Sequence, residues 1–151
     1  MLISFGNSGQ FGNGYFTSAH RIAHALEYGY PARIHDLGNY LDKLNTGNHH
    51  PSIRLAGGSA MLISKVIYRI LQAGTQRPRL SFGNNEIIRD TQGPFPLGRE
   101  ELATLAARQT VVHRGWGYRD AELLVKHADT VRSILSLRED LIDTSRSADK
   151  A

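Results

Sequence analysis

Glycines crowd the region that follows the first apolar run of the chain. Gly6, Gly9, Gly12 and Gly14 fall within nine residues, after Met1–Phe5 and ahead of a helical pattern. Glycine lets a backbone approach a ligand closely, and the free amides at the start of a helix favour an anion. The spacing matches neither the dinucleotide fingerprint Gly-x-Gly-x-x-Gly nor the Gly-Lys-Ser/Thr ending of a phosphate-binding P-loop. Two interpretations stay open: a loop that binds an anion or a nucleotide, and a tight turn between a strand and a helix.

Two histidines are the next residues that could do chemistry. His20 and His24 are four positions apart on a predicted helix, a spacing that can direct two metal ligands to one side. No third ligand stands nearby, and the glutamate of a metalloprotease helix is missing between them. The pair falls opposite Ile22 and Leu26. We therefore expect these histidines to be solvated or to line a groove, without binding a metal.

A polar and aromatic cluster occupies residues 113–120, with the sequence His-Arg-Gly-Trp-Gly-Tyr-Arg-Asp. It follows a predicted strand, and ligands of open α/β sheets bind beyond the carboxyl ends of the strands. Arg114 or Arg119 could therefore contact an anionic group. In the alternative interpretation, Trp116 packs against the last helix and Asp120 caps it. The chain shows no convincing Ser/His/Asp arrangement and no paired carboxylates.

Strands and helices alternate along the sequence, which is typical of an α/β protein with a Rossmann-like beginning. Gly29 is a suitable stop for the first helix, and residues 36–58 have the composition of a loop. The helix at 59–74 is apolar over a wide face, so we expect it against the sheet. The patterns predict strands at 1–5, 32–35, 79–82, 86–89 and 110–112, and helices at 15–28, 59–74, 100–107 and 120–136.

The overall composition excludes several classes of protein. The chain has 151 residues, a formal charge of +4 and no cysteine. Disulfides, thiolate zinc sites, iron–sulfur clusters and a cysteine nucleophile are therefore excluded. The positive charge is spread along the chain, so the sequence does not favour nucleic-acid binding. No apolar run is long enough to span a membrane, and we expect a cytoplasmic protein.

Two segments share motifs with a known enzyme family. The first contains Ile3-Ser-Phe-Gly and then Gly9-Gln-Phe-Gly12-Asn13, followed by the helix at 15–28 and the strand at 32–35. The second reads Gly115-Trp-Gly-Tyr-Arg-Asp120-Ala-Glu-Leu-Leu-Val-Lys-His127 and continues to Val131-Arg132-Ser-Ile134. Together they resemble fucosyltransferase-like glycosyltransferases, a group that includes the bacterial α-1,2-fucosyltransferases. Those enzymes open with a strand and a Gly-x-Leu/Phe-Gly-Asn loop, and carry a Gly-Trp-x-Phe/Tyr-Arg-Asp turn before a helix that ends in Ile/Val-Arg.

The resemblance implies a GT-B fold with two facing Rossmann-like domains. It also implies inverting transfer of fucose from GDP-fucose to a glycan acceptor, with no cofactor and no metal. Gly9, Gly12 and Asn13 carry over as residues that line the cleft between the domains, with His20 and His24 on the helix that flanks it. The family usually has Gln after this Asn, whereas this chain has Gly14.

One family motif is missing. The family carries a His-x-Arg-Arg-Gly-Asp-like strand after the Ile/Val-Arg helix, and its Arg holds the phosphates of the donor. Nothing after Arg132 matches that motif. We therefore expect residues 1–137 to form the acceptor-side domain of an incomplete GT-B enzyme, which does not transfer fucose alone. Residues 138–151 would be a polar tail or the start of a missing second domain, with the helix at 120–136 left partly uncovered on its apolar face.

Two functions from other classes stay open beside this one. The chain could be a small Rossmann-like module that binds a nucleotide or an anion through the loop at Gly9–Gly14. It could also be a non-catalytic interaction domain that pairs with a partner chain.

Overall fold

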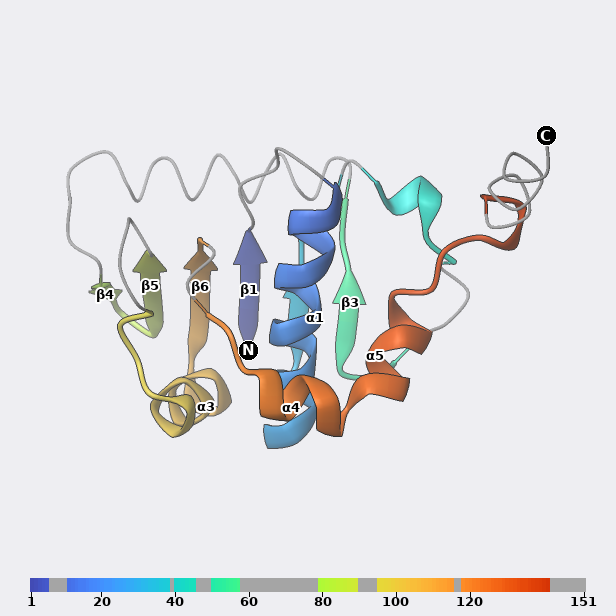
Figure 1. Ribbon diagram of the computed structural model, residues 1–151. Helices are drawn as coiled ribbons and strands as arrows, with labels where there is room; N and C mark the ends of the chain where they lie inside the picture. Colours follow the sequence, from blue (N-terminus) through green and yellow to red (C-terminus); the bar gives the residue numbers. More distant parts are fainter. Residues whose placement is uncertain are drawn as a thin grey trace.

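Six strands form one sheet in the order β3-β2-β1-β6-β5-β4 in the computed structural model (Figure 1). Residues 1–5, 11–38, 40–45, 50–57, 79–89, 95–115 and 118–141 are described. Every neighbouring pair of strands is parallel except β4 and β5, which form an antiparallel hairpin around Gly83. The predicted α/β class is confirmed, and the sheet is compatible with a Rossmann-like fold. The strands are β1 (Leu2–Phe5), β2 (Ala32–Ile34), β3 (Ile53–Leu55), β4 (Arg79–Phe82), β5 (Asn85–Arg89) and β6 (Thr110–Arg114).

The first strand lies at the centre of the sheet. Leu2 of β1 is in register with Ala32 of β2 on one side and Val111 of β6 on the other. These three side chains are buried, and they belong to one hydrophobic core with Ile22 of the first helix. Strands that are buried in a parallel sheet are short apolar runs, which is why the sequence pattern predicts β1 and β6 well.

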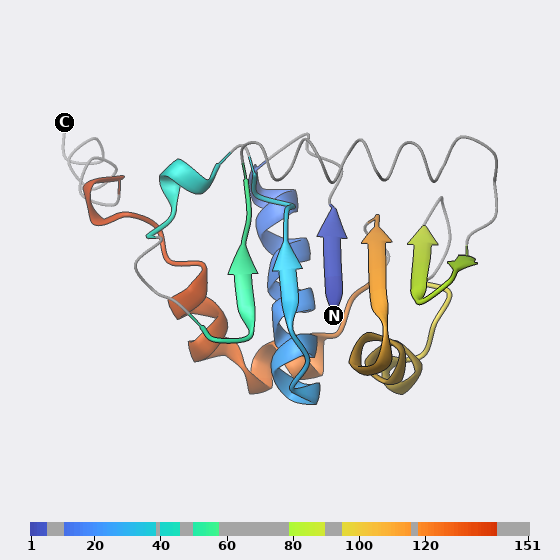
Figure 2. The ribbon, with the colours of Figure 1, turned by 180° about the vertical axis from the view of Figure 1, so that it is seen from behind.

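Helix α1 (Phe11–Tyr28) covers one face of the sheet, in front of the strands in Figure 1 and behind them in Figure 2. It begins at Phe11, so the prediction that residues 11–14 belong to a loop is wrong. Gly14 permits this early start, because a Cβ there would lie 2.9 Å from the carbonyl oxygen of Asp36. The helix is followed by Gly29 at φ +67°, the left-handed conformation expected of a glycine stop.

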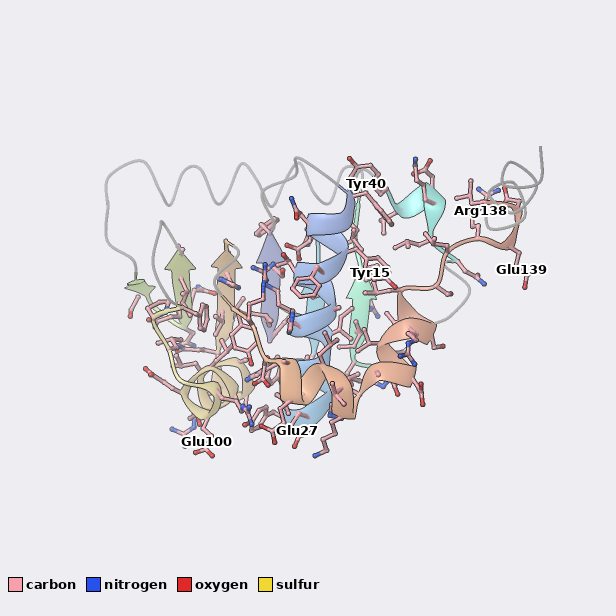
Figure 3. The ribbon with its side chains drawn as sticks, in the orientation of Figure 1. Tyr15, Glu27, Tyr40, Glu100, Arg138 and Glu139 are labelled. Atoms are coloured by element: carbon pink, nitrogen blue, oxygen red, sulfur yellow. The ribbon has the colours of Figure 1, made fainter. Side chains whose placement is uncertain are left out.

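Two short helices, α4 (Ala121–Lys126) and α5 (Ala128–Ile134), replace the single helix predicted at 120–136. The break lies at His127, whose Nε2 is 2.8 Å from Oε2 of Glu27 near the end of α1. Lys126 donates a hydrogen bond of 2.8 Å to the other oxygen of the same carboxylate. Glu27 lies in Figure 3 where α4 crosses the lower part of α1. Helix α4 thus packs on α1, and α1 separates it from the sheet.

Helix α3 (Arg99–Arg108) lies below β5 and β6 in both ribbon views and leads directly into β6. It confirms the helix predicted at 100–107. The hairpin of β4 and β5 likewise follows the predicted strands closely, and β6 starts at the predicted Thr110 but continues to Arg114. The helix predicted at 59–74 lies outside the described residues.

The stretch predicted as a loop at 36–58 contains two short elements that the sequence pattern missed. They are the 3₁₀ turn η1 (Leu41–Lys43) and the edge strand β3. A strand of three residues is too short to show a periodic pattern. Residues just after α5 contact η1, since Leu137 forms a bridge with Leu44 and Arg138 donates a hydrogen bond of 3.2 Å to the Asp42 carbonyl. No helix among the described residues is long and apolar enough to cross a membrane.

Candidate functional site

A buried ion pair lies at the carboxyl ends of three strands. Nη1 of Arg21, from the middle of α1, is 2.5 Å from Oδ1 of Asp36, which follows β2. The same guanidinium donates to the hydroxyl of Ser4 in β1, and through Nη2 to the carbonyl of Gly115 after β6 at 2.6 Å. Ser4 in turn donates to the Asp36 carboxylate. One side chain of α1 thus connects the segments that leave β1, β2 and β6.

The ion pair is enclosed by the protein. The side chains of Arg21 and Asp36 are 1% and 0% exposed, and Ser4 is also buried. Both terminal nitrogens of Arg21 are engaged, while Nε has no partner among the described residues. A charge that is buried and hydrogen-bonded in this way holds its neighbours in place rather than meeting a ligand. The cluster therefore positions the strand ends at which α/β proteins bind ligands.

His20 connects α1 to the start of α4. Its Nδ1 lies 3.0 Å from both the amide nitrogen and the carbonyl oxygen of Asp120. Burial lowers the pKa of His20, with the nearby cation of Arg119 as a lesser cause in the same direction. The Asp120 side chain accepts a hydrogen bond from the amide of Leu123, which confirms the predicted N-cap of the last helical region.

His24 lies one turn further along α1 and has different partners. Its Nδ1 is 2.5 Å from the hydroxyl of Tyr30, and its Nε2 is 3.0 Å from the carbonyl of Arg99. Because a carbonyl only accepts, the Nε2–H donates to it and Nδ1 accepts from Tyr30 in the neutral ring. The rings of Tyr28 and Tyr118 pack around it. Burial lowers the pKa of His24.

The two histidines do not form the solvated pair that the helical pattern predicts. His20 and His24 are 2% and 0% exposed, so the prediction of a polar, solvated face is wrong. The cause is that α4 covers the side of α1 that faces away from the sheet, so α1 is buried on two sides. Among the described residues, no group of three or more His, Cys, Asp or Glu side chains could hold a metal ion.

The remaining predicted site residues are scattered. Gly9 lies outside the described residues. Gly12 and Asn13 lie in the first turn of α1, and Gly12 is exposed with open space around it. At 1.5 Å per residue, Gly12 is roughly 18 Å along the helix from His24. The structure therefore does not bring all of the predicted cleft residues together.

The two predicted anion contacts also separate. Arg114 is the last residue of β6, in register with Phe5 of β1 and Arg89 of β5, and its side chain is outside the described part. Arg119 is exposed, and its guanidinium carbon lies 4.9 Å above the ring of Phe16. That geometry is a cation–π contact, and Nη1 of Arg119 also donates a hydrogen bond of 3.1 Å to the Tyr118 carbonyl.

Sequence reasoning missed an apolar groove between α1 and the two short helices. Its volume is about 280 Å³, and Tyr15 lies on α1 beside α5 in Figure 3. Phe16 and Val125 beside it are 49% and 76% exposed. The apolar face predicted on 120–136 is mostly covered, because Val131, Ile134 and Leu135 are buried, and the exposed Val125 lies off that face. The groove is lined by Tyr15, Phe16, Ala19, Leu124, Val125, Ala128, Val131 and Arg132.

Comparisons with known proteins leave the family open. No protein-family model matches the chain, and neither the curated proteins nor the solved structures include a significant match.

Proposed function

We propose that this chain is the acceptor-side Rossmann-like domain of a fucosyltransferase-like glycosyltransferase with a GT-B fold. The observation that carries the proposal is the contact between the two segments that share the family's motifs. Residues 1–37 and 110–140 are far apart in sequence, yet β1 and β6 are neighbouring strands. Motifs that serve one site are expected to lie in neighbouring parts of a fold, and the adjacent positions of β1 and β6 support this.

The contact between the segments is specific. Arg21, from the first segment, donates to the carbonyl of Gly115, which opens the second. His20 lies against the backbone of Asp120, the residue that ends the aromatic turn of the second motif. Helix α4 then packs along α1. The first turn of α1 and Gly115, which follows β6, thus lie at the carboxyl end of the sheet, where ligands of α/β proteins bind.

The described charges near this end support an acceptor side over a donor side. The pyrophosphate leaving group of GDP-fucose needs fixed cations that stabilise its developing charge. Among the side chains that the structure describes, Arg21 is the buried cation at this end, and it is committed to Asp36, Ser4 and Gly115. We therefore expect the domain to contact the glycan acceptor, through residues such as Gly12 and Asn13, and not to transfer fucose alone.

Titration with substrates tests the proposal. Uniformly ¹⁵N-labelled chain would be titrated with fucose-acceptor oligosaccharides and, separately, with GDP-fucose. We expect saturable shifts of the Gly12 and Asn13 amides with an acceptor glycan, and no heat signal or turnover with GDP-fucose in calorimetry. Micromolar binding of GDP-fucose accompanied by fucose transfer would overturn the acceptor-side assignment. An absence of shifts across a broad panel of acceptor glycans would overturn the glycosyltransferase proposal.

A nucleotide-binding module is the second candidate, because α1 starts close to the carboxyl end of β1 with an exposed Gly12 in its first turn. An anion could approach the free amides of that turn. In this case a free mononucleotide such as GMP would protect the amides of residues 9–16 from hydrogen exchange. Protection by GMP without any effect of acceptor glycans would favour this function over the first.

A further inference from the structure

Two arginines stand side by side on the face of the sheet opposite α1. The register of β2 and β3 pairs Arg33 with Arg54, and both are exposed. Their neighbours Ala32, Ile34 and Ile53 point the other way, into the core beneath α1. Figure 2 shows this face, with β2 and β3 in front of α1.

This pair of like charges has no counter-charge in the described part of the chain. The residues that are in register with this pair on the neighbouring strands include no carboxylate. From β3 to β5 they are Arg54, Arg33, Ile3, Val112 and Ile87. Neither arginine has a hydrogen bond or ion pair with a described residue. Like charges directly opposite one another on neighbouring strands repel, so the arrangement is unfavourable in the protein by itself.

Three other arginines have an acidic partner. Arg99 is 2.7 Å from Asp120, Arg132 is 2.8 Å from Asp129, and Arg138 is 2.9 Å from Asp140. Each of these three guanidinium groups thus lies within ion-pair distance of a carboxylate. Arg33 and Arg54 have no such partner among the described residues, and the register places them directly opposite each other on adjacent strands.

We propose that Arg33 and Arg54 form a binding site for the phosphate group of a small soluble ligand. Guanidinium groups present several N–H donors in a planar fork that matches the oxygens of phosphate. Neighbouring strands lie about 4.8 Å apart, so two forks can approach different oxygens of one phosphate. The half-buried Ile3 beside Arg33 offers an apolar surface for the rest of the ligand. The site is independent of the proposed acceptor-side function, because it lies on the other face of the sheet.

Titrations with inorganic phosphate and pyrophosphate, followed by ¹⁵N chemical shifts at low ionic strength, test the site. We expect saturable shifts centred on residues 33 and 54, and at least about tenfold weaker binding in the double variant Arg33→Gln/Arg54→Gln. The double variant Arg33→Lys/Arg54→Lys keeps both charges but loses the forks, and should also bind several-fold more weakly. The matched control is Arg108→Gln, an exposed arginine at the end of α3, which should bind phosphate like the parent chain.

The controls separate this site from general attraction of anions. All substitutions are at exposed side chains, so far-ultraviolet circular dichroism should confirm an unchanged fold. Equal weakening in Arg108→Gln and in the Arg33/Arg54 variants would overturn the proposal, because it would indicate only diffuse counter-ion attraction. Binding to vesicles of anionic phospholipid without saturable binding of phosphate or pyrophosphate would also overturn it, in favour of a membrane-surface contact.

Discussion

The buried pair of Arg21 and Asp36 gives the sharpest test of the structure. Arg21→Met removes the cation but keeps an unbranched apolar side chain. The Asp36 carboxylate then stays buried, with the Ser4 hydroxyl as its remaining hydrogen-bond donor among the described residues. Breaking a fully buried pair on one side costs about 3–5 kcal/mol. The Gly115 carbonyl also loses its 2.6 Å hydrogen bond. A domain of this size has roughly 5–15 kcal/mol of stability, so the loss is a large fraction of the total.

Urea unfolding monitored by circular dichroism measures this loss. With a slope of about 2 kcal/mol per molar urea, we expect the midpoint to fall by roughly 2 M in Arg21→Met. The double variant Arg21→Met/Asp36→Leu should recover a substantial part of this loss, because no uncompensated charge then remains in the interior. Arg132→Met is the matched control, since the pair of Arg132 with Asp129 is exposed on α5 and should contribute little.

Two outcomes would refute this reasoning. A change below about 1 kcal/mol in Arg21→Met would mean that water reaches the carboxylate and the pair is not buried. Additive losses in the double variant would mean that the two side chains do not interact. Either result would also remove the explanation of how the segments after β1, β2 and β6 are held together.

Three further outcomes follow from the local geometry. Gly14→Ala should lower the free energy of unfolding by about 1–3 kcal/mol in thermal unfolding, because its Cβ would lie 2.9 Å from the Asp36 carbonyl oxygen. Gly12→Ala should raise it by up to about 1 kcal/mol, because a Cβ there meets no other atom and alanine favours a helix. Asp120→Ala should lower the free energy of unfolding by at least about 1 kcal/mol in guanidinium titrations, while Asp120→Ser should retain most of the stabilisation from the cap. Equal losses in the two variants would contradict the capping role. Burial lowers the pKa of His24 in the folded chain, so the unfolded chain binds more protons as the pH falls below about 6.5, and the free energy of unfolding should decrease between pH 7 and 5.5. His24→Gln should flatten that decrease, and an unchanged slope would contradict the assignment.

The order of strands and helices could be predicted from the sequence where the local pattern is strong. Residues 2–5 and 110–114 are short apolar or β-branched runs, and both are strands in the parallel sheet. The cap at Asp120 and the stop at Gly29 follow from backbone chemistry that acts within a few residues.

The candidate site was harder to predict, because it depends on contacts between distant elements. Arg21 has the appearance of a surface residue on a helix, and only the approach of Asp36 and Gly115 shows why it is buried. His20 and His24 fall on a face that a helical projection assigns to solvent. The face is buried because α4, about a hundred residues later in the chain, packs there. The start of α1 at Phe11 similarly depends on Gly14 meeting the segment after β2.

The central position of β1 has a consequence for how the chain folds during synthesis. Strand β2, on one side of β1, starts at Ala32, but strand β6, on the other side, starts only at Thr110. At about 5–20 residues per second, a ribosome needs roughly 4–16 s to make the residues between these two partners. Throughout that interval one edge of an apolar strand has no native partner, so nascent chains should be most prone to aggregation before β6 emerges. The separation between Leu2–Phe5 and Thr110–Arg114 therefore sets how long this edge of β1 waits for its native partner.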